Sequence, residues 1–387
     1  MKTSKLHITV GHNGRAPEKL TEEITDIDRQ IYKNVVSTDL SPEQIERIVN
    51  PTEVFYQQDS ILAVHWHPEF IPMDLIFKRI RATFPNSKEE LIIPTQHNDL
   101  LSVNGFSGVE IDCYAKGFNR KVQLLVHFEE SQVKEATVFK NMLAHTFKYR
   151  HGQLYEFIDT ILDPKYEDRL QKAAAKTGAD DDIVNFVRIN VAKVKSLIEE
   201  NFSITPREML RNKILKYFID GLRDHCDDRF IERAQIFLKA VKKIVKANFS
   251  LEHFYETQEF IEEIRALGGG IVVPHPEQFW PVLLADYDVD GYEVWNPQSR
   301  EFTEFLITVV QRQNQRRKNS ERQLLVFMGD DCHMGEKTKE PRFQDFEKAN
   351  RQIGYQPAWD DPAIRKNLIV ANINRKRVIT EYKNRLN

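Results

Sequence analysis

The stretch ILAVHWH, residues 61–67, is an apolar run that ends in two histidines. Three later segments also end an apolar run with a histidine or a carboxylate: IIPTQH at 92–97, GIVVPH at 270–275 and LLVFMGDDCH at 324–333. Barrel and open-sheet α/β proteins carry their functional side chains at the carboxyl ends of strands. Four such ends that converge would form a metal site at one mouth of the fold.

The sequence around these segments changes its periodicity twice. From 61 to about 128, short apolar runs and one helical stretch indicate a βα unit followed by several strands. Residues from about 135 to 265 indicate helix almost throughout, and after the glycines at 268–270 strands and helices alternate again. Alternation of this kind favours a parallel α/β arrangement, either closed or doubly wound.

We therefore expect an α/β core interrupted by a helical insertion. Near the start, LHITV at 6–10 predicts a strand, and Ser41 before Pro42 predicts a capped helix start. The expected parts are an N-terminal extension at 1–60, a first α/β part at 61–134, the helical insertion at 135–265, a second α/β part at 266–345 and C-terminal helices at 346–387.

Composition narrows the class of protein. No apolar run approaches the roughly 20 residues of a membrane helix, and the first residues lack the apolar core of a signal peptide. Cys113, Cys226 and Cys332 form no spaced pair, so we expect a soluble protein of the reducing cytoplasm. A net charge of −3 favours neither a membrane nor a general nucleic-acid partner. The densest basic run, at 312–322, is expected to be a solvated helix end or loop.

Several of the polar residues suit metal binding. His65 and His67 are two apart, so both imidazoles lie on one side of an extended segment. Glu110 lies in the apolar stretch GVEID, where a metal would neutralise a charge that is costly to bury. His127 ends the apolar run VQLLVHF and is either a ligand or a hydrogen-bonded core histidine.

A shared metal site explains these residues better than coincidence does. Mixed imidazole and carboxylate ligands suit zinc, manganese or iron. The candidates exceed what one tetrahedral ion needs, so we expect two or three divalent ions, with Glu110 or Asp331 bridging. The candidate ligands are His65, His67, His97, Glu110, His127, His275, Asp331 and His333.

These motifs, in this order, resemble the PHP (polymerase and histidinol phosphatase) superfamily of metal-dependent phosphoesterases, especially its nucleotide-phosphatase-like branch. The resemblance covers most of residues 61–340 and implies a distorted (β/α)7 barrel that holds up to three metals. The family's H-x-H, T-D-H, G-x-E, A-H-P and G-S-D-x-H motifs are matched, in turn, by His65 to His67, Thr95 to His97, Gly108 to Glu110, Val273 to Pro276 and Gly329 to His333.

The chain departs from the family's pattern at three places. The family's aspartate or histidine shortly after H-x-H has no exact match, so either Glu69 or Asp74 serves instead or the site has lost this ligand. Gln96 replaces the usual aspartate beside His97. The histidine expected after the glutamate strand falls at Gln123, which leaves His127 on the same strand face as a substitute.

The resemblance implies hydrolysis of a small phosphorylated substrate, a phosphomonoester or nucleotide, by a metal-activated water. Nucleic acid is expected only as a substrate, and the oligomeric state is not predicted. The rival functions are an amidohydrolase-like metal hydrolase and a PHP-like scaffold that has lost activity and binds a partner. The residues assigned to catalysis are His65, His67, Glu110, Asp331 and His333.

Positively charged residues in the helical insertion could bind the substrate phosphate. Arg207 and Arg211 lie near the helix start that Pro206 predicts. Arginines on a helix surface are also commonly solvated, so both readings remain open for these two residues.

Overall fold

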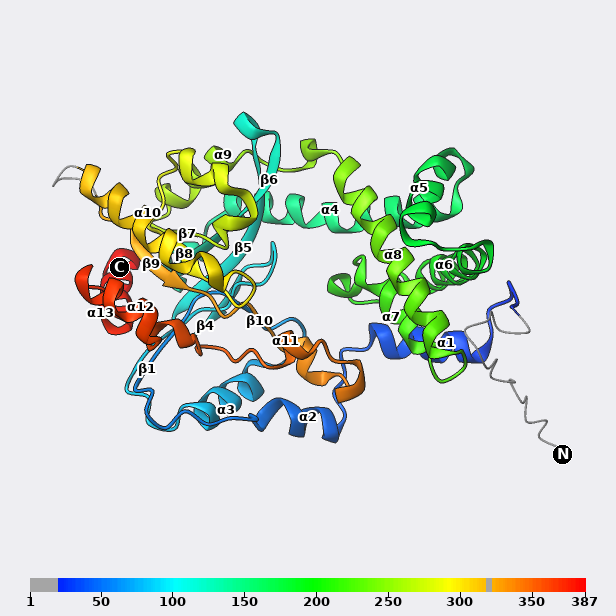
Figure 1. Cartoon of the computed structure of the whole chain (residues 1–387), viewed down its shortest axis with the longest axis horizontal. Coiled ribbons are helices and arrows are strands. Elements are labelled where there is room, and N and C mark those ends of the chain that lie inside the picture. The colour runs from blue at the N-terminus through cyan, green and yellow to red at the C-terminus, as the bar shows by residue number, and fades with distance from the viewer. Residues whose placement is uncertain (1–19, 318–321) are drawn as a thin grey trace. The chain divides into compact units, whose positions relative to one another are not determined.

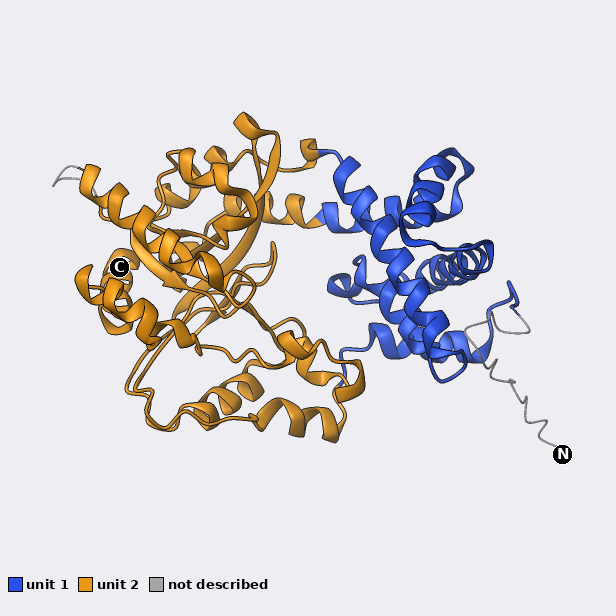
Figure 2. Cartoon of the chain, viewed as in Figure 1, with its two compact units in different colours: residues 1–39, 148–250 blue, residues 40–147, 251–387 orange. Residues whose placement is uncertain are grey.

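The computed structural model of the chain describes residues 20–317 and 322–387. The strand predicted at 6–10 lies outside the described residues. The chain divides into two compact units: residues 1–39 and 148–250 form unit 1, and residues 40–147 and 251–387 form unit 2 (Figure 2). The stretch expected as an N-terminal extension is thus shared between the two units.

Unit 1 is helical and has its own apolar core. Phe186 and Phe230 meet edge to face there, with ring centroids 5.0 Å apart, and the buried Lys193 ammonium lies 2.9 Å from the Asp28 carboxylate. The insertion expected from the sequence is therefore helical. The helices of this unit are α1 Asp26–Val36, the last turns of α4 Thr137–Leu162, α5 Glu167–Thr177, α6 Asp181–Asn201, α7 Lys213–Gly221 and α8 Asp228–Asn248.

Unit 2 is built on a six-stranded mixed sheet with the order β4-β5-β6-β7-β8-β9 (Figure 1). The strands β7, β8 and β9 are parallel, whereas β4, β5, β6 and β7 are mutually antiparallel along the sheet. The strands are β4 Leu101–Val103, β5 Phe106–Ala115, β6 Arg120–Glu129, β7 Gly270–Val273, β8 Gly291–Trp295 and β9 Leu325–Met328. The predicted mixed α/β class is confirmed.

Two short parallel pairs complete the strands. β1 Ser60–Ala63 pairs with β3 Glu89–Ile92, and β2 Trp66–His67 pairs with β10 Cys332–His333. Among the described residues these pairs and the six-stranded sheet are three separate hydrogen-bonded ladders, so no closed barrel forms from strands alone. An isolated parallel bridge between His97 and Glu110 adds one link from the loop after β3 to β5.

The helices of unit 2 pack around these strands. The predicted helix start at Ser41 is confirmed: its Oγ accepts from the Gln44 amide at 3.3 Å, and Gln44 Oε1 accepts from the Ser41 amide at 2.8 Å. None of the helices in the described ranges is long and apolar enough to cross a membrane. Besides the first turns of α4, the helices are α2 Pro42–Val49, α3 Met73–Thr83, α9 Thr257–Ala266, α10 Thr303–Arg316, α11 Phe346–Ala349, α12 Pro362–Val370 and α13 Arg375–Leu386.

Candidate metal centre

The strand-end residues of unit 2 come together in one cluster. Seven of the eight predicted ligands belong to three overlapping groups in which one ligand atom per residue lies within 4.8 Å of the others. The groups are His67, His97 and His333; His65, Glu110 and His275; and His65, His67 and Asp331. In the structure, the ligand atoms of these side chains already face one another.

Backbone pairing explains why segments far apart in sequence meet here. The parallel register of β2 and β10 places His67 beside His333, and the bridge from His97 to Glu110 brings the third segment alongside. The His67 ring stacks on His333 with centroids 4.2 Å apart and on His97 with centroids 4.4 Å apart. The nitrogens of buried imidazoles such as these need a hydrogen-bond or metal partner.

The nitrogens of His67 lack such a partner. The residue is 1% exposed, yet neither Nδ1 nor Nε2 has a hydrogen-bond partner among the described residues. Buried polar atoms are nearly always satisfied, so this pair requires a ligand outside the chain. Burial, together with the neighbouring His333 and His97, lowers the pKa of His67 to about 3, which keeps the ring neutral and able to bind a metal.

Asp331 presents one carboxylate oxygen to three imidazoles. Its Oδ1 lies 3.7 Å from His65 Nε2, 3.5 Å from His67 Nε2 and 3.4 Å from His333 Nε2. These separations are long for hydrogen bonds. They are close to the roughly 3.3 to 3.6 Å between two ligand atoms that each lie about 2.0–2.2 Å from one tetrahedral ion. Asp331 is therefore suited to binding metal through Oδ1.

The other oxygen of Asp331 is fixed by the protein. Arg351 Nη1 donates to Asp331 Oδ2 at 2.7 Å and to the Asp331 carbonyl at 2.8 Å, and Gln298 Nε2 donates to Oδ2 at 3.2 Å. The side chain is thus oriented before any ion binds. Sequence patterns did not indicate Arg351, because it lies beyond the last motif and reaches the site only through the fold.

Glu293 is a buried carboxylate behind His65 that the sequence patterns did not single out. Its Oε1 lies 2.7 Å from His65 Nδ1, and its Oε2 accepts from the His275 amide at 2.9 Å and from Asn296 Nδ2 at 3.3 Å. A hydrogen bond at Nδ1 turns His65 Nε2 toward the cluster, as in the carboxylate–histidine–metal arrangement of many metalloproteins. The sequence could have indicated Glu293, because it is a charged residue inside the buried strand β8.

Glu293 also determines the charge and the packing around His65. Burial by itself lowers the pKa of His65, but the carboxylates of Glu293, Asp331 and Glu110 outweigh it and raise the pKa to about 10. A metal ion would therefore displace a proton from this ring. A Cβ at Gly329 would lie 1.4 Å from Glu293 Oε1, so only glycine leaves room for the carboxylate.

Of the two candidates for a ligand after His67, Glu69 lies beside the cluster and Asp74 does not. Its side chain is 7% exposed, and its Oε1 lies 3.6 Å from His333 Nδ1. The Glu69 amide donates to Gln96 Oε1 at 3.1 Å, so the glutamine that replaces the family's aspartate helps to hold this turn. The Asp74 side chain is 67% exposed and lies 3.6 Å from Lys78, away from the cluster.

His127 is a correction to the predicted ligand set. Its Nδ1 lies 2.8 Å from the Tyr382 hydroxyl and its Nε2 lies 2.9 Å from the Val64 carbonyl, so both nitrogens are already satisfied. Burial lowers its pKa to about 4, which keeps the ring neutral. It faces Gly108 across the β5–β6 ladder, whereas Gln123 faces Asp112. His127 is a hydrogen-bonded core histidine.

The two arginines proposed for substrate phosphate lie in unit 1. Arg207 begins the short 3-10 helix η4 Arg207–Met209, and Arg211 follows it by two residues. Their role in binding phosphate stays a prediction.

Comparisons with known proteins add a distant likeness. No family model matches the chain, and no curated protein matches it. A solved structure of a candidate metal-dependent phosphoesterase from Bifidobacterium adolescentis is similar, with a TM-score of 0.41 and 18% identity over 81% of this chain and 96% of that one. At this level of similarity, the chemistry of the site has to be judged from its own geometry.

Proposed function

We propose that the chain is a metal-dependent phosphoesterase that binds two or three divalent ions of manganese, zinc or iron. One observation carries the proposal: imidazole and carboxylate side chains from strand ends spread between residues 65 and 333 converge in three overlapping ligand groups. Imidazole and carboxylate together suit these metals. The substrate class is a phosphomonoester or a nucleotide.

More than one ion is favoured by the way the groups overlap. His65 and His67 each belong to two of the three groups, and Glu110 Oε2 lies 2.5 Å from His97 Nδ1 and 3.5 Å from His67 Nε2. Glu110 belongs to the group of His65 and His275, and its Oε2 faces two imidazoles of another group, so it is placed to bridge two ions. Glu110 and Asp331 are the proposed bridging ligands.

A PHP-type barrel is the architecture that we propose around this site. The Asp331 amide donates to the His65 carbonyl at 3.0 Å, and the Thr95 amide donates to the Trp66 carbonyl at 2.9 Å. With the bridge from His97 to Glu110, these bonds link the end of β9, the β2 segment, the end of β3 and β5. They support a ring that is closed at the metal-binding mouth by irregular backbone.

Phosphate-ester hydrolysis fits the charge of the cluster. Carboxylates at Glu69, Glu110, Asp331 and Glu293 would repel an anionic substrate, so the site needs cations before it can accept one. Bound divalent ions would lower the pKa of a water to near neutral and offset the charge of the phosphoryl oxygens. The protein's own residues orient the metal ligands: Glu293 holds His65, and Arg351 holds Asp331.

Neither rival function has a specific observation in its favour. An amidohydrolase-like site is expected to use a lysine carbamate as its bridging ligand, whereas the bridging ligands proposed here are the carboxylates Glu110 and Asp331. The inactive scaffold rested on ligands missing after His67 and at Gln123. Glu69 lies 3.6 Å from His333 Nδ1 and answers the first gap, whereas His127 does not fill the second, which bears on the third ion.

Metal analysis and hydrolysis of nitrophenyl phosphate test the proposal together. The purified chain should contain manganese, iron or zinc and should hydrolyse the ester. His65→Ala combined with His333→Ala should remove both properties. His145→Ala is the matched control, because this exposed histidine of α4 lies outside the ligand groups. A metal-free, inactive wild type, or activity that survives the double substitution, would contradict the proposal.

A further inference from the structure

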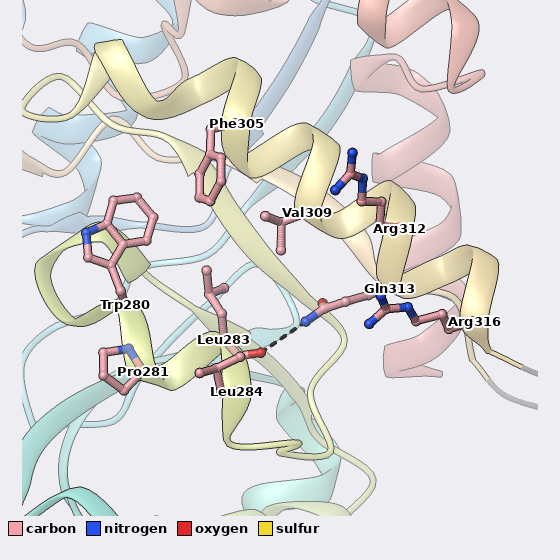
Figure 3. A pocket seen from close by; sticks show the side chains of 9 residues that line it. All are labelled: Trp280, Pro281, Leu283, Leu284, Phe305, Val309, Arg312, Gln313 and Arg316. Atoms are coloured by element: carbon pink, nitrogen blue, oxygen red, sulfur yellow. Dashed lines mark hydrogen bonds between the residues drawn. The ribbon is translucent and has the colours of Figure 1, made fainter.

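A pocket lies between the 3-10 segment η6 Pro276–Leu284 and helix α10, both of which belong to unit 2 (Figure 3). Its volume is about 460 Å³, within the range of small-molecule sites. The apolar walls are formed by Trp280, Leu283 and Leu284 from η6 and by Phe305 and Val309 from α10. None of the residues that line it belongs to the metal centre.

One face of α10 runs along the whole pocket. Phe305, Val309, Arg312 and Arg316 are spaced by four, three and four residues, so they lie on the same side of the helix. The pocket therefore changes from apolar to cationic toward the end of α10. Gln313 Nε2 donates to the Leu283 carbonyl at 3.1 Å, which ties α10 to η6 across the pocket (Figure 3).

The apolar walls are exposed to an unusual degree. Leu284 is 82% exposed, Phe305 is 54% exposed and Trp280 is 37% exposed. The Trp280 ring holds its place through edge-to-face contacts with Phe302 and Phe305, with centroids 5.1 Å and 5.4 Å away. Large apolar side chains gathered around a hollow mark a binding site more often than scattered surface residues do.

The two arginines, Arg312 and Arg316, have no ion-pair partner in the part of the chain that the structure describes. They belong to the basic run at 312–322, which the sequence predicted to be solvated. Two guanidinium groups beside an apolar pocket carry two positive charges, and a phosphate monoester carries about −1.5 to −2 at neutral pH, whereas a carboxylate carries one.

We propose that this pocket binds a single-chain amphiphile with an alkyl tail and a phosphate-type head group. The tail would lie against Leu283, Leu284 and Val309, and the head group would meet Arg312 and Arg316. Bases stack on aromatic faces at successive positions, whereas the rings of Trp280 and Phe305 meet edge to face at 82°. The aliphatic side chains of Leu283, Leu284 and Val309 favour an alkyl chain. The volume of about 460 Å³ is that of a small-molecule pocket, which favours a small molecule over a protein partner.

Octylphosphonate is the probe that tests this site, because a phosphoesterase does not cleave its C–P bond. Calorimetry and tryptophan fluorescence should both report binding by the full chain. Trp280 is the exposed tryptophan, whereas Trp66, Trp295 and Trp359 are buried. The fluorescence change should therefore be lost in Trp280→Phe while the calorimetric signal remains.

Charge-neutralising substitutions separate the head group from the tail. Arg312→Gln with Arg316→Gln should weaken octylphosphonate binding about tenfold and leave octanol binding unchanged. Octanoate should bind wild type less tightly than octylphosphonate does. Arg120→Gln with Arg365→Gln is the matched control, since both arginines are exposed and outside the pocket, and it should bind like wild type.

Several results would overturn the proposal. They are no binding of octylphosphonate, equal loss in the two double variants, and tighter binding of octanoate than of octylphosphonate. Displacement of octylphosphonate by a single-stranded oligonucleotide would assign the surface to nucleic acid instead. A dimer in sedimentation that Arg312→Gln with Arg316→Gln dissociates, and that octylphosphonate does not, would assign it to a second copy of the chain.

Discussion

Gly329→Ala tests how strictly the protein positions His65. The added methyl carbon would lie 1.4 Å from Glu293 Oε1 and 2.3 Å from its Cδ, where real contacts are at least 3.0 Å. Glu293 would have to retreat by at least 1.6 Å, so it could not keep its 2.7 Å bond to His65 Nδ1 and its 2.9 Å bond from the His275 amide. Losing such a partner behind a metal ligand typically costs 10- to 100-fold in metal affinity or activity.

The measurement is a competition titration of manganese or zinc against a chromophoric chelator, followed by the rate of nitrophenyl phosphate hydrolysis. Glu293→Gln should give a loss of similar size, because the amide cannot supply the negative charge that His65 needs when it is protonated or bound to metal. Gly117→Ala is the control, since a Cβ there meets nothing within 4 Å. Wild-type metal affinity in Gly329→Ala would refute the role given to Glu293.

Three further predictions concern the ligand set and the core. Glu69→Gln should lower the number of bound ions by about one in elemental analysis, whereas the exposed Asp74→Asn should leave it unchanged; the reverse pattern would exclude Glu69. Burial lowers the pKa of His127 from its ordinary value of 6.5 to about 4 in the folded chain, so folded wild type should lose about 2 kcal/mol of stability between pH 7 and pH 5 that His127→Gln does not lose in urea unfolding. Equal pH dependence of both proteins would contradict a buried neutral His127. Removing metal with EDTA should lower the thermal midpoint of wild type but not of His65→Ala, because ions that bind only the folded chain stabilise it.

The sequence indicated the site well where a strand end carried the ligand. His65, His67, His97, His275 and His333 each follow an apolar run, and all of them lie in the ligand groups. Period-two alternation also placed His127 on the same strand face as Gln123, where the resemblance implies a histidine. Alternation does not fix the position along the strand: His127 faces Gly108, two pairs along the ladder from Glu110, and two residues of strand span roughly 6.6 Å.

Other parts of the site depend on tertiary structure that no local pattern carries. Tyr382, which engages His127, comes from the last helix, and Arg351 lies beyond the last motif. Glu293 had a usable signal, a charge in a buried strand, and the same reasoning had already selected Glu110. The sequence indicated only part of the pocket beside α10. Its arginines stood out as a basic run, but no pattern showed that apolar residues of η6 lie next to them.

The central claim is that the strand-end side chains hold metal ions, and a crystal structure of the manganese-loaded chain with anomalous scattering tests it most directly. We expect two or three ions, each about 2.0–2.3 Å from nitrogen or oxygen atoms of His65, His67, Glu110, Asp331 and their neighbours, and none beside His127. Ions bound elsewhere, or an empty cluster at saturating manganese, would contradict the account.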